Sequence, residues 1–459
     1  MQGRHNLPAA GGAIDRDAAV AWLDGRINFE RTPPGGSAAK TFGLARMRRL
    51  LAAIGGPHAR LPVAHVAGTK GKGSTVAMLA AILQESGYRV GRYMSPHVHA
   101  LEERICVDGR PIAGADLAAA CAVVRPAVER LDAAAARRGG RGPSWFEVMT
   151  AVAFVHFARV GVDIVVLETG LGGRLDATNV VRPLVTVITS ISLDHMALLG
   201  PTIGRIAAEK AGIIKRGRPV VSARQRPAAR RVIAATAARR RARLLELGRD
   251  FTVAHAAVDP LRGDRVAIGL PDGRVLRCRL GMAGRHQAEN AALAAVAAGE
   301  LTRAGFAVPA AAIARGLART RLPARIERVA SRPVTILDAA HNVASMRSLL
   351  ETLAPLLARM RPRVLLFAAS GDKQIENMLA AAAGHFDHVV VTRYATHARA
   401  AGIERLTAAC RQAGLPEPLV AATPREALTA ARSLATRSGL VCVAGSFFLA
   451  AEVGLGRRR

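Results

Sequence analysis

Aromatic residues are scarce in this sequence, where Phe, Trp and Tyr together make up 3% of the 459 residues. Proteins that bind single-stranded nucleic acid stack the bases on such side chains. The scarcity therefore weighs against a nucleic-acid partner, although 65 basic and 34 acidic residues leave a net charge of +31. Because Arg and Ala are frequent throughout, we favour a compositional bias as the source of this charge. Polyanionic substrates are another explanation.

Cysteine is also sparse, and long apolar runs are missing. The five cysteines, at positions 106, 121, 278, 410 and 442, show no C-x-x-C spacing. This scatter weighs against a disulfide framework or a zinc site and predicts small, buried thiols in a reducing compartment. No window holds about 20 uninterrupted apolar residues, and the N-terminal stretch has no apolar core typical of a signal peptide. We therefore expect a cytoplasmic protein without a membrane partner.

Apolar runs of strand length alternate with helical patterns along most of the chain. Such alternation predicts a parallel sheet covered by helices, so the fold class is α/β. Residues 15–58 look helical around a loop at 31–41, residues 228–246 look helical, and residues 250–282 look like short β-strands. The strands expected in the first half are 62–67, 163–168, 184–191 and 219–223, with helices at 74–84, 146–158, 286–304 and 309–319.

A second alternating series follows a predicted linker at residues 321–329. Its expected strands are 334–338, 364–368, 388–392, 419–421 and 440–444. The length of the chain suits two or three domains. We therefore predict a larger domain over residues 1–322 and a smaller α/β domain over residues 323–459.

The segment "VAHVAGTKGKGSTVAML" (63–79) joins an apolar strand to a helix through a loop rich in Gly and Lys. It fails the strict G-x-x-x-x-G-K-[ST] phosphate-loop pattern, because Val66 and Gly73 stand where Gly and Ser or Thr are required. Converging backbone N–H groups before a helix nevertheless suit a phosphate, and we favour this interpretation over a plain turn. The predicted ATP contacts in the loop are Gly68, Thr69, Lys70, Gly71, Lys72, Gly73, Ser74 and Thr75.

This loop resembles the ATP loop of the Mur ligase superfamily, and more narrowly that of folylpolyglutamate synthase and dihydrofolate synthase. In that family the loop departs from the strict pattern in the same way, with Asn more common where this chain has Lys70. Further segments match in order, from about residue 14 to residue 453. They are "YMSPHVHALEERI" (93–105), "FEVMTAVAF" (146–154), "VVLETGLGGRLDATNVV" (165–181), "SISLDHMALLG" (190–200), "EKAGIIK" (209–215), "HQAENAALA" (286–294), "LPARIE" (322–327), "LDAAHN" (337–342) and "SGDKQIENML" (370–379).

The resemblance implies a magnesium site and a modified lysine in the first domain. Glu168 ends an apolar strand, at the edge of a parallel sheet where ligands bind, and a carboxylate oxygen suits Mg²⁺. The family match makes Glu168, Ser95 and His195 the metal ligands. Lys210 resembles the lysine that the family carbamylates. Trp145, Phe146 and Asp176 stand where the resemblance places the folate site.

Other matched residues lie in or beside the second domain. Asp338 is expected to accept from the ribose of the nucleotide, and His341 to lie near the base or the reacting phosphate. Asn290 and Arg325 are expected to contact adenine and phosphate. The resemblance thus assigns catalytic roles to Lys72, Lys210 and His341. Lys373 lies in a segment that departs from the family pattern, where Gln374 replaces an acid.

These matches imply a Mur-ligase-type central domain with a parallel sheet flanked by helices and a small β region, followed by a smaller Rossmann-like domain. The implied activity is ATP- and Mg²⁺-dependent addition of L-glutamate to dihydropteroate, to folates or to both, by a monomer. Potassium dependence is left open. One alternative is another ligase of the superfamily, although no uridine-diphosphate-sugar domain pattern precedes Gly68. The other is a basic P-loop protein that binds nucleic acid.

Overall fold

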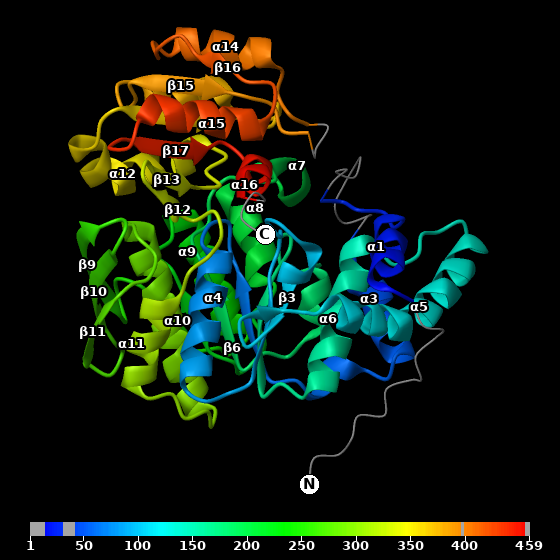
Figure 1. The fold of residues 1–459 in the computed structure, drawn as a ribbon. Coiled ribbons are helices and arrows are strands. Elements are labelled where there is room, and N and C mark those ends of the chain that lie inside the picture. Colours follow the sequence, from blue (N-terminus) through cyan, green and yellow to red (C-terminus); the bar gives the residue numbers. More distant parts are fainter. Residues whose placement is uncertain (1–13, 31–41, 396–398, 455–459) are drawn as a thin grey trace.

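The computed structural model describes residues 14–30, 42–395 and 399–454. The chain forms two helix-covered sheets, and the smaller one, formed by the C-terminal part of the chain, lies at the top of the view in Figure 1. The predicted loop at residues 31–41 lies outside the described residues. Among the described helices, none is long and apolar enough to cross a membrane.

The larger sheet has eight strands in the order β4-β3-β2-β5-β1-β6-β7-β8. The strands from β2 to β8 in this order run parallel, while β3 and β4 pair antiparallel at one edge. The strand bounds are β1 Val63–Ala67, β2 Val90–Tyr93, β3 Ile105–Val107, β4 Arg110–Pro111, β5 Ile164–Glu168, β6 Val185–Ile188, β7 Val220–Ser222 and β8 Leu244–Glu246.

Both faces of this sheet are covered, which is why β1 and β5 read as continuous buried runs rather than as alternating ones. One face packs against helices α1 (Arg16–Asp24), α3 (Leu44–Ala53), α5 (Gly114–Ala136) and α6 (Trp145–Val160). The other packs against α4 (Lys72–Glu85), α10 (Arg285–Arg303) and α11 (Ala310–Arg319). Helices α7 (Met196–Leu199), α8 (Ile203–Ala211) and α9 (Pro227–Arg239) form a further apolar cluster beside β6 and β7.

Most of the buried residues of helix α10 are alanines. The helix packs against α4 and against strands β6 and β7, and seven of its buried residues are alanines. These alanines are Ala288, Ala291, Ala292, Ala294, Ala295, Ala297 and Ala298. Small side chains let two helices approach closely, so the first turn of α10 is held tightly against the start of α4.

A three-stranded antiparallel sheet links the two halves. It consists of β9 (Thr252–Asp259), β10 (Gly263–Gly269) and β11 (Val275–Arg279), in the order β11-β10-β9. The described residues of the first half also include three short 3-10 helices, namely η1 (Pro57–Arg60), η2 (Leu101–Arg104) and η3 (Ala177–Val180).

The smaller sheet has six strands in the order β12-β13-β17-β14-β15-β16, and only β12 runs antiparallel. Helices α12, α13 and α14 cover one face, and α15 and α16 cover the other. The bounds are β12 Glu327–Ser331, β13 Val334–Leu337, α12 Val343–Arg359, β14 Arg363–Phe367, α13 Ile375–Ala382, β15 His388–Val391, α14 Ile403–Gln412, β16 Leu419–Val420, α15 Pro424–Ala435, β17 Leu440–Ala444 and α16 Phe447–Gly454.

The α/β class, the expected strands and most expected helices are confirmed, while three predictions were wrong. The helix predicted over residues 228–246 ends at Arg239, and Leu244–Glu246 pairs with β7 as an edge strand. Part of the predicted linker, from Glu327, forms β12. Cys278 is only half-buried, because β11 is an outer strand of the three-stranded sheet; the other four cysteines are buried, and all five are free. The domain boundary at residue 322 stays a prediction.

Candidate active site

The Gly-rich loop connects β1 to α4 at the carboxyl edge of the large sheet. The backbone N–H groups of Thr69 and Lys70 donate to the carbonyl of Ser190, at 2.9 and 3.2 Å. The hydroxyl of Thr75 donates to the carbonyl of Gly71 at 2.9 Å, and α4 begins immediately after Gly71. The loop is thus fixed by the segment after β6, and its N–H groups at the helix start are free to face an anion.

Gly71 needs to be glycine for two reasons. Its φ is +84°, a left-handed conformation that other residues rarely adopt. A Cβ at this position would also collide with the side-chain amide of Asn290, in the first turns of α10. The structure therefore brings the phosphate loop and one predicted adenine contact together.

Gly71→Ala is expected to weaken ATP binding at least tenfold, because both backbone strain and the collision with Asn290 displace the loop. Titration calorimetry with ATP would measure this change. Gly87→Ala is the matched control, since Gly87 has a φ of +89° with no atom in the way of a Cβ. Equal ATP affinity in both variants would contradict the role of the Asn290 contact.

Lys72 and Glu168 form an ion pair beside the loop. Lys72 is the first residue of α4, and its Nζ lies 3.7 Å from Oε1 of Glu168, the last residue of β5. Glu168 is 3% exposed, and its other oxygen accepts from the backbone N–H of Ser95 at 3.3 Å. Burial raises the pKa of Glu168, and the neighbouring Lys72 opposes that shift.

Lys210, near the end of α8, reaches the same loop from the other side. Its buried Nζ donates to the carbonyl of Gly68 at 2.7 Å. Burial, with the charge of Lys72 adding to it, lowers the pKa of Lys210 to about 7. The side chain therefore has a large neutral fraction at physiological pH, which makes it a nucleophile in a way that an exposed lysine is not.

Cations from both halves of the chain gather at the loop. The pKa of Lys70 is lowered first by burial and also by the charges of Arg325, Lys72 and Lys373, while Asp194 opposes the shift. Arg325 precedes β12, and Lys373 follows β14. Such a group of like charges attracts anions, and a polyphosphate is a ligand that would suit it.

The residues after β13 lie next to Arg325. The Asp338 carboxylate accepts from the backbone N–H groups of Ile326 and Ala340, both at 2.9 Å. The Arg325 guanidinium and the His341 ring both lie against Phe447, at 5.0 and 5.6 Å from its ring centroid. Burial and then Lys70 lower the pKa of His341 to about 4, so this imidazole is neutral at pH 7.

The predicted magnesium ligands are brought together in part. Glu168 and Ser95 are in contact, and the buried carboxylate is a hard oxygen donor of the kind that Mg²⁺ prefers. His195 has a left-handed backbone with φ of +48°, and its exposed ring lies 3.9 Å from Asp194. Within the described ranges, no three His, Cys, Asp or Glu side chains form a ready metal cluster. The carboxylate of Glu168, with Ser95 beside it, suits the metal. That Glu168, Ser95 and His195 bind Mg²⁺ stays a prediction.

The three residues predicted for folate lie on the α6 side of the sheet. Trp145 is 2% exposed, and the Arg104 guanidinium covers its ring at 4.7 Å, so Trp145 belongs to the core. Phe146 is partly buried and packs against Gly170. Asp176 is buried and caps η3, where it accepts from the backbone N–H of Thr178 at 3.0 Å. Their contact with a folate stays a prediction.

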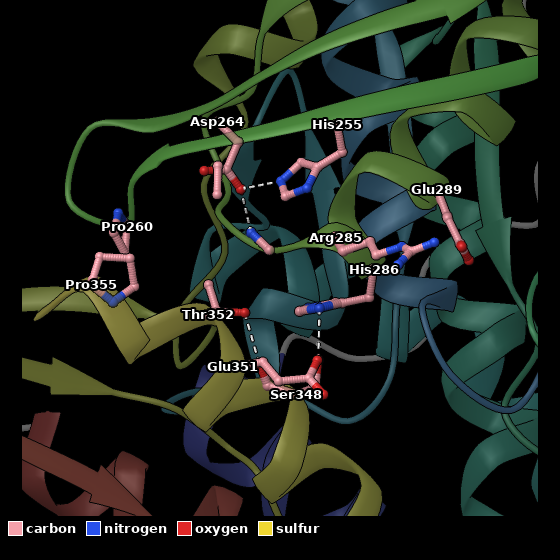
Figure 2. A pocket seen from close by; sticks show the side chains of 12 residues that line it. His255, Pro260, Asp264, Arg285, His286, Glu289, Ser348, Glu351, Thr352 and Pro355 are labelled. Atoms are coloured by element: carbon pink, nitrogen blue, oxygen red, sulfur yellow. Dashed lines mark hydrogen bonds and ion pairs between the residues drawn. The ribbon is translucent and has the colours of Figure 1, made fainter. Parts of the chain in front are cut away.

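A separate cavity of about 280 Å³ lies where the C-terminal part rests on the three-stranded sheet (Figure 2). Asp264 accepts there from His255 Nε2 and from the backbone N–H of Gly284, both at 2.7 Å. The His286 ring, at the start of α10, is 2.9 Å from the Ser348 hydroxyl of α12. No predicted site residue lines this cavity, so we assign it to the junction between the two halves rather than to the site.

Comparison with known proteins decides the family. The Mur ligase middle domain matches residues 146–298, and the Mur ligase glutamate ligase domain matches residues 324–447. The chain is 41% identical over 363 residues to the dihydrofolate synthase/folylpolyglutamate synthase of Bacillus subtilis, covering 79% of this chain and 81% of that protein. It belongs to the dihydrofolate synthase and folylpolyglutamate synthase family. It is accordingly an ATP-dependent ligase.

Solved structures of the family share the whole fold. The folylpolyglutamate synthase of Mycobacterium tuberculosis, solved with ADP, superimposes with a TM-score of 0.86 at 33% identity, covering 97% of this chain and all of that one. The Escherichia coli FolC structure with DHPP and ADP gives a TM-score of 0.81 at 30% identity, covering 98% and 99%. The Mur ligase fold predicted from the sequence is thereby confirmed.

Several residues that complete the site were not predicted from the sequence. Phe447 supports Arg325 and His341, and Arg104 covers Trp145 while it pairs with Glu30. Asp194 was visible only as the neighbour of His195. A buried arginine or an aromatic at the start of the last helix carries no local sequence signal, because its partners are distant in the chain.

Proposed function

We propose that this ligase adds L-glutamate to dihydropteroate and to folates, and that it is bifunctional. The observation that carries the proposal is one Gly-rich loop whose Lys72 pairs with Glu168 and which Lys210 and Asn290 reach from other elements. The relatives named for both activities support it, as does the related structure solved with DHPP and ADP.

In the proposed reaction an oxygen of the acceptor carboxylate attacks the γ-phosphorus of ATP. The bond to the β,γ-bridging oxygen breaks, so ADP leaves and an acyl phosphate forms. The glutamate amine then attacks the acyl carbon, loses a proton, and displaces phosphate. Activation is necessary because a carboxylate is a poor electrophile whose negative charge repels nucleophiles.

The residues of the chain have distinct parts in this scheme. Gly68–Thr75 holds the phosphates, and Lys72 offsets charge that develops on the transferred phosphoryl group. Asn290 contacts adenine, while Asp338 accepts from the ribose hydroxyls. Arg325 and the neutral His341 lie at the phosphate from the C-terminal side.

Two further groups complete the proposed site. Glu168 and Ser95 would hold Mg²⁺, which supplies charge neutralisation to the phosphates when bound. Lys210 would be carbamylated, which turns a cation into an oxygen donor. Closure of the two halves over ATP excludes the water that would hydrolyse an acyl phosphate. A monomeric state is part of the proposal.

Purified protein with ATP, Mg²⁺ and L-glutamate tests the acceptor directly. One reaction receives dihydropteroate and the other tetrahydrofolate, and mass spectrometry weighs each product. We expect glutamate on both acceptors. Addition to one alone would name a single activity. Addition to neither, with the protein folded, would overturn the proposed acceptor class.

A further inference from the structure

A buried series of hydrogen-bonded side chains connects strand β1 with the carboxylate proposed to bind folate. His65 lies in β1, three residues before the phosphate loop, and Thr178 lies in η3. Neither side chain is exposed to solvent. The His65 Nε2 is 2.9 Å from the Thr178 hydroxyl oxygen, which in turn is 2.5 Å from Oδ1 of Asp176.

The direction of each hydrogen bond follows from the partners. Asp176 accepts from the backbone N–H groups of Thr178 and Leu171, at 3.0 and 2.8 Å, as an ionised carboxylate does. An ionised carboxylate only accepts, so the Thr178 hydroxyl donates to it. The lone pairs of that hydroxyl then accept from His65, whose ring carries its hydrogen on Nε2.

This assignment explains the other ring nitrogen. The buried Nδ1 of His65 has no hydrogen-bond partner. With the hydrogen on Nε2, the unpartnered atom is a bare lone pair and not a buried N–H donor. Burial, with Lys215 adding to it, lowers the pKa of His65 to about 3, so the ring holds one hydrogen at neutral pH.

We propose that His65 and Thr178 are positioning residues for the acceptor site, and that they fix the Asp176 carboxylate through this hydrogen-bond chain. The inference rests on the proposed function. The hydrogen bond from His65 fixes the orientation of the Thr178 hydroxyl, so that its hydrogen points to Asp176. Asp176 also holds Leu171, which neighbours the glycine on which Phe146 packs. Loss of the hydroxyl therefore displaces two parts of the proposed folate site at once.

The test measures KM separately for the acceptor and for ATP. Thr178→Val keeps the shape of the side chain but removes the donor, and we expect the acceptor KM to rise about tenfold. The ATP KM stays within about twofold of the wild type, because the phosphate loop is untouched. Thr178→Ser, which keeps the hydroxyl, restores the acceptor KM.

His65 acts only through Thr178, so the two positions must be coupled. His65→Phe is expected to raise the acceptor KM about threefold in the wild type and to have no further effect beside Thr178→Val. His65→Gln, whose amide reaches as far as Nε2, retains most of the wild-type value. Additive effects of the two substitutions would contradict the chain, and thermal unfolding of each variant checks the fold.

The outcomes separate this inference from the proposed function. A wild type that adds glutamate, together with an unchanged acceptor KM in Thr178→Val, overturns the inference alone. An equal rise of both KM values would show a structural role only, and also overturns it. A wild type that adds glutamate to neither acceptor overturns both proposals. If Thr178→Val fails to fold, the acceptor KM values of His65→Phe and His65→Gln are compared instead. A rise in His65→Phe alone supports the inference, and equal values in the two variants overturn it.

Discussion

Lys72→Ala is expected to lower kcat by a factor on the order of 10³, in the range found for single groups that offset charge on a transferred phosphoryl. The Nζ of Lys72 is held at the start of α4 by the buried Glu168, 3.7 Å away. Its removal takes the cation from the phosphates and also leaves the Glu168 carboxylate buried without its partner, so the pKa of Glu168 rises further. Steady-state phosphate release measures the effect.

Lys70→Ala provides the matched control for that experiment. Lys70 lies in the same loop and carries the same charge, but its side chain shares its surroundings with Arg325 and Lys373. Neighbouring cations therefore replace much of its contribution, and we expect a loss of about tenfold or less. A folded Lys72→Ala protein with activity near that of the wild type would refute the assignment of this loop.

Removal of carbon dioxide is expected to lower the activity at least tenfold, and bicarbonate is expected to restore it. Carbamylation joins the neutral Lys210 nitrogen to CO₂ and releases a proton. With a pKa of about 7, Lys210 is mostly neutral at about pH 8 and mostly protonated at about pH 6. At equal dissolved CO₂, recovery should therefore be faster and fuller at the higher pH, and assays after re-addition of CO₂ at each pH measure it.

Two variants make the carbamylation experiment specific. Lys210→Ala is expected to be nearly inactive and to give no response to bicarbonate. Lys215 is another lysine whose pKa burial lowers, to about 8, but its Nζ donates to Asn179 away from the loop. Lys215→Gln should keep the bicarbonate response. A wild type that is indifferent to CO₂ would exclude a carbamylated Lys210 and leave only its bond to Gly68.

The sequence predicted those parts of the fold whose signals are local. The buried strands β1 and β5 are continuous apolar runs, and the helix after the Gly-rich loop has a clear start. Edge elements were predicted less well: β8 follows an Arg- and Ala-rich helix, and its three residues add no separate pattern. Strand β12 was assigned to a linker because its pairing with β13 shows only in three dimensions.

For the site, the sequence supplied the candidates but not their pairings. Glu168 was predicted from its place at a strand end, whereas its pairing with Lys72 joins residues far apart in the chain. The same holds for Lys210 and Gly68, which are 142 residues apart. Trp145 directly precedes a matched motif, and sequence alone could not show that Arg104 already covers its ring.

The buried alanines of α10 have a consequence for the effect of substitutions in this helix. Seven of the buried residues of α10 are alanines, and extra volume in a well-packed core forces shifts of side chains and backbone. Asn290 lies in the first turns of α10, against Gly71. Substitutions such as Ala294→Val, remote from any substrate, are therefore expected to change the affinity for ATP. Natural or laboratory variation within this helix has the same expected consequence.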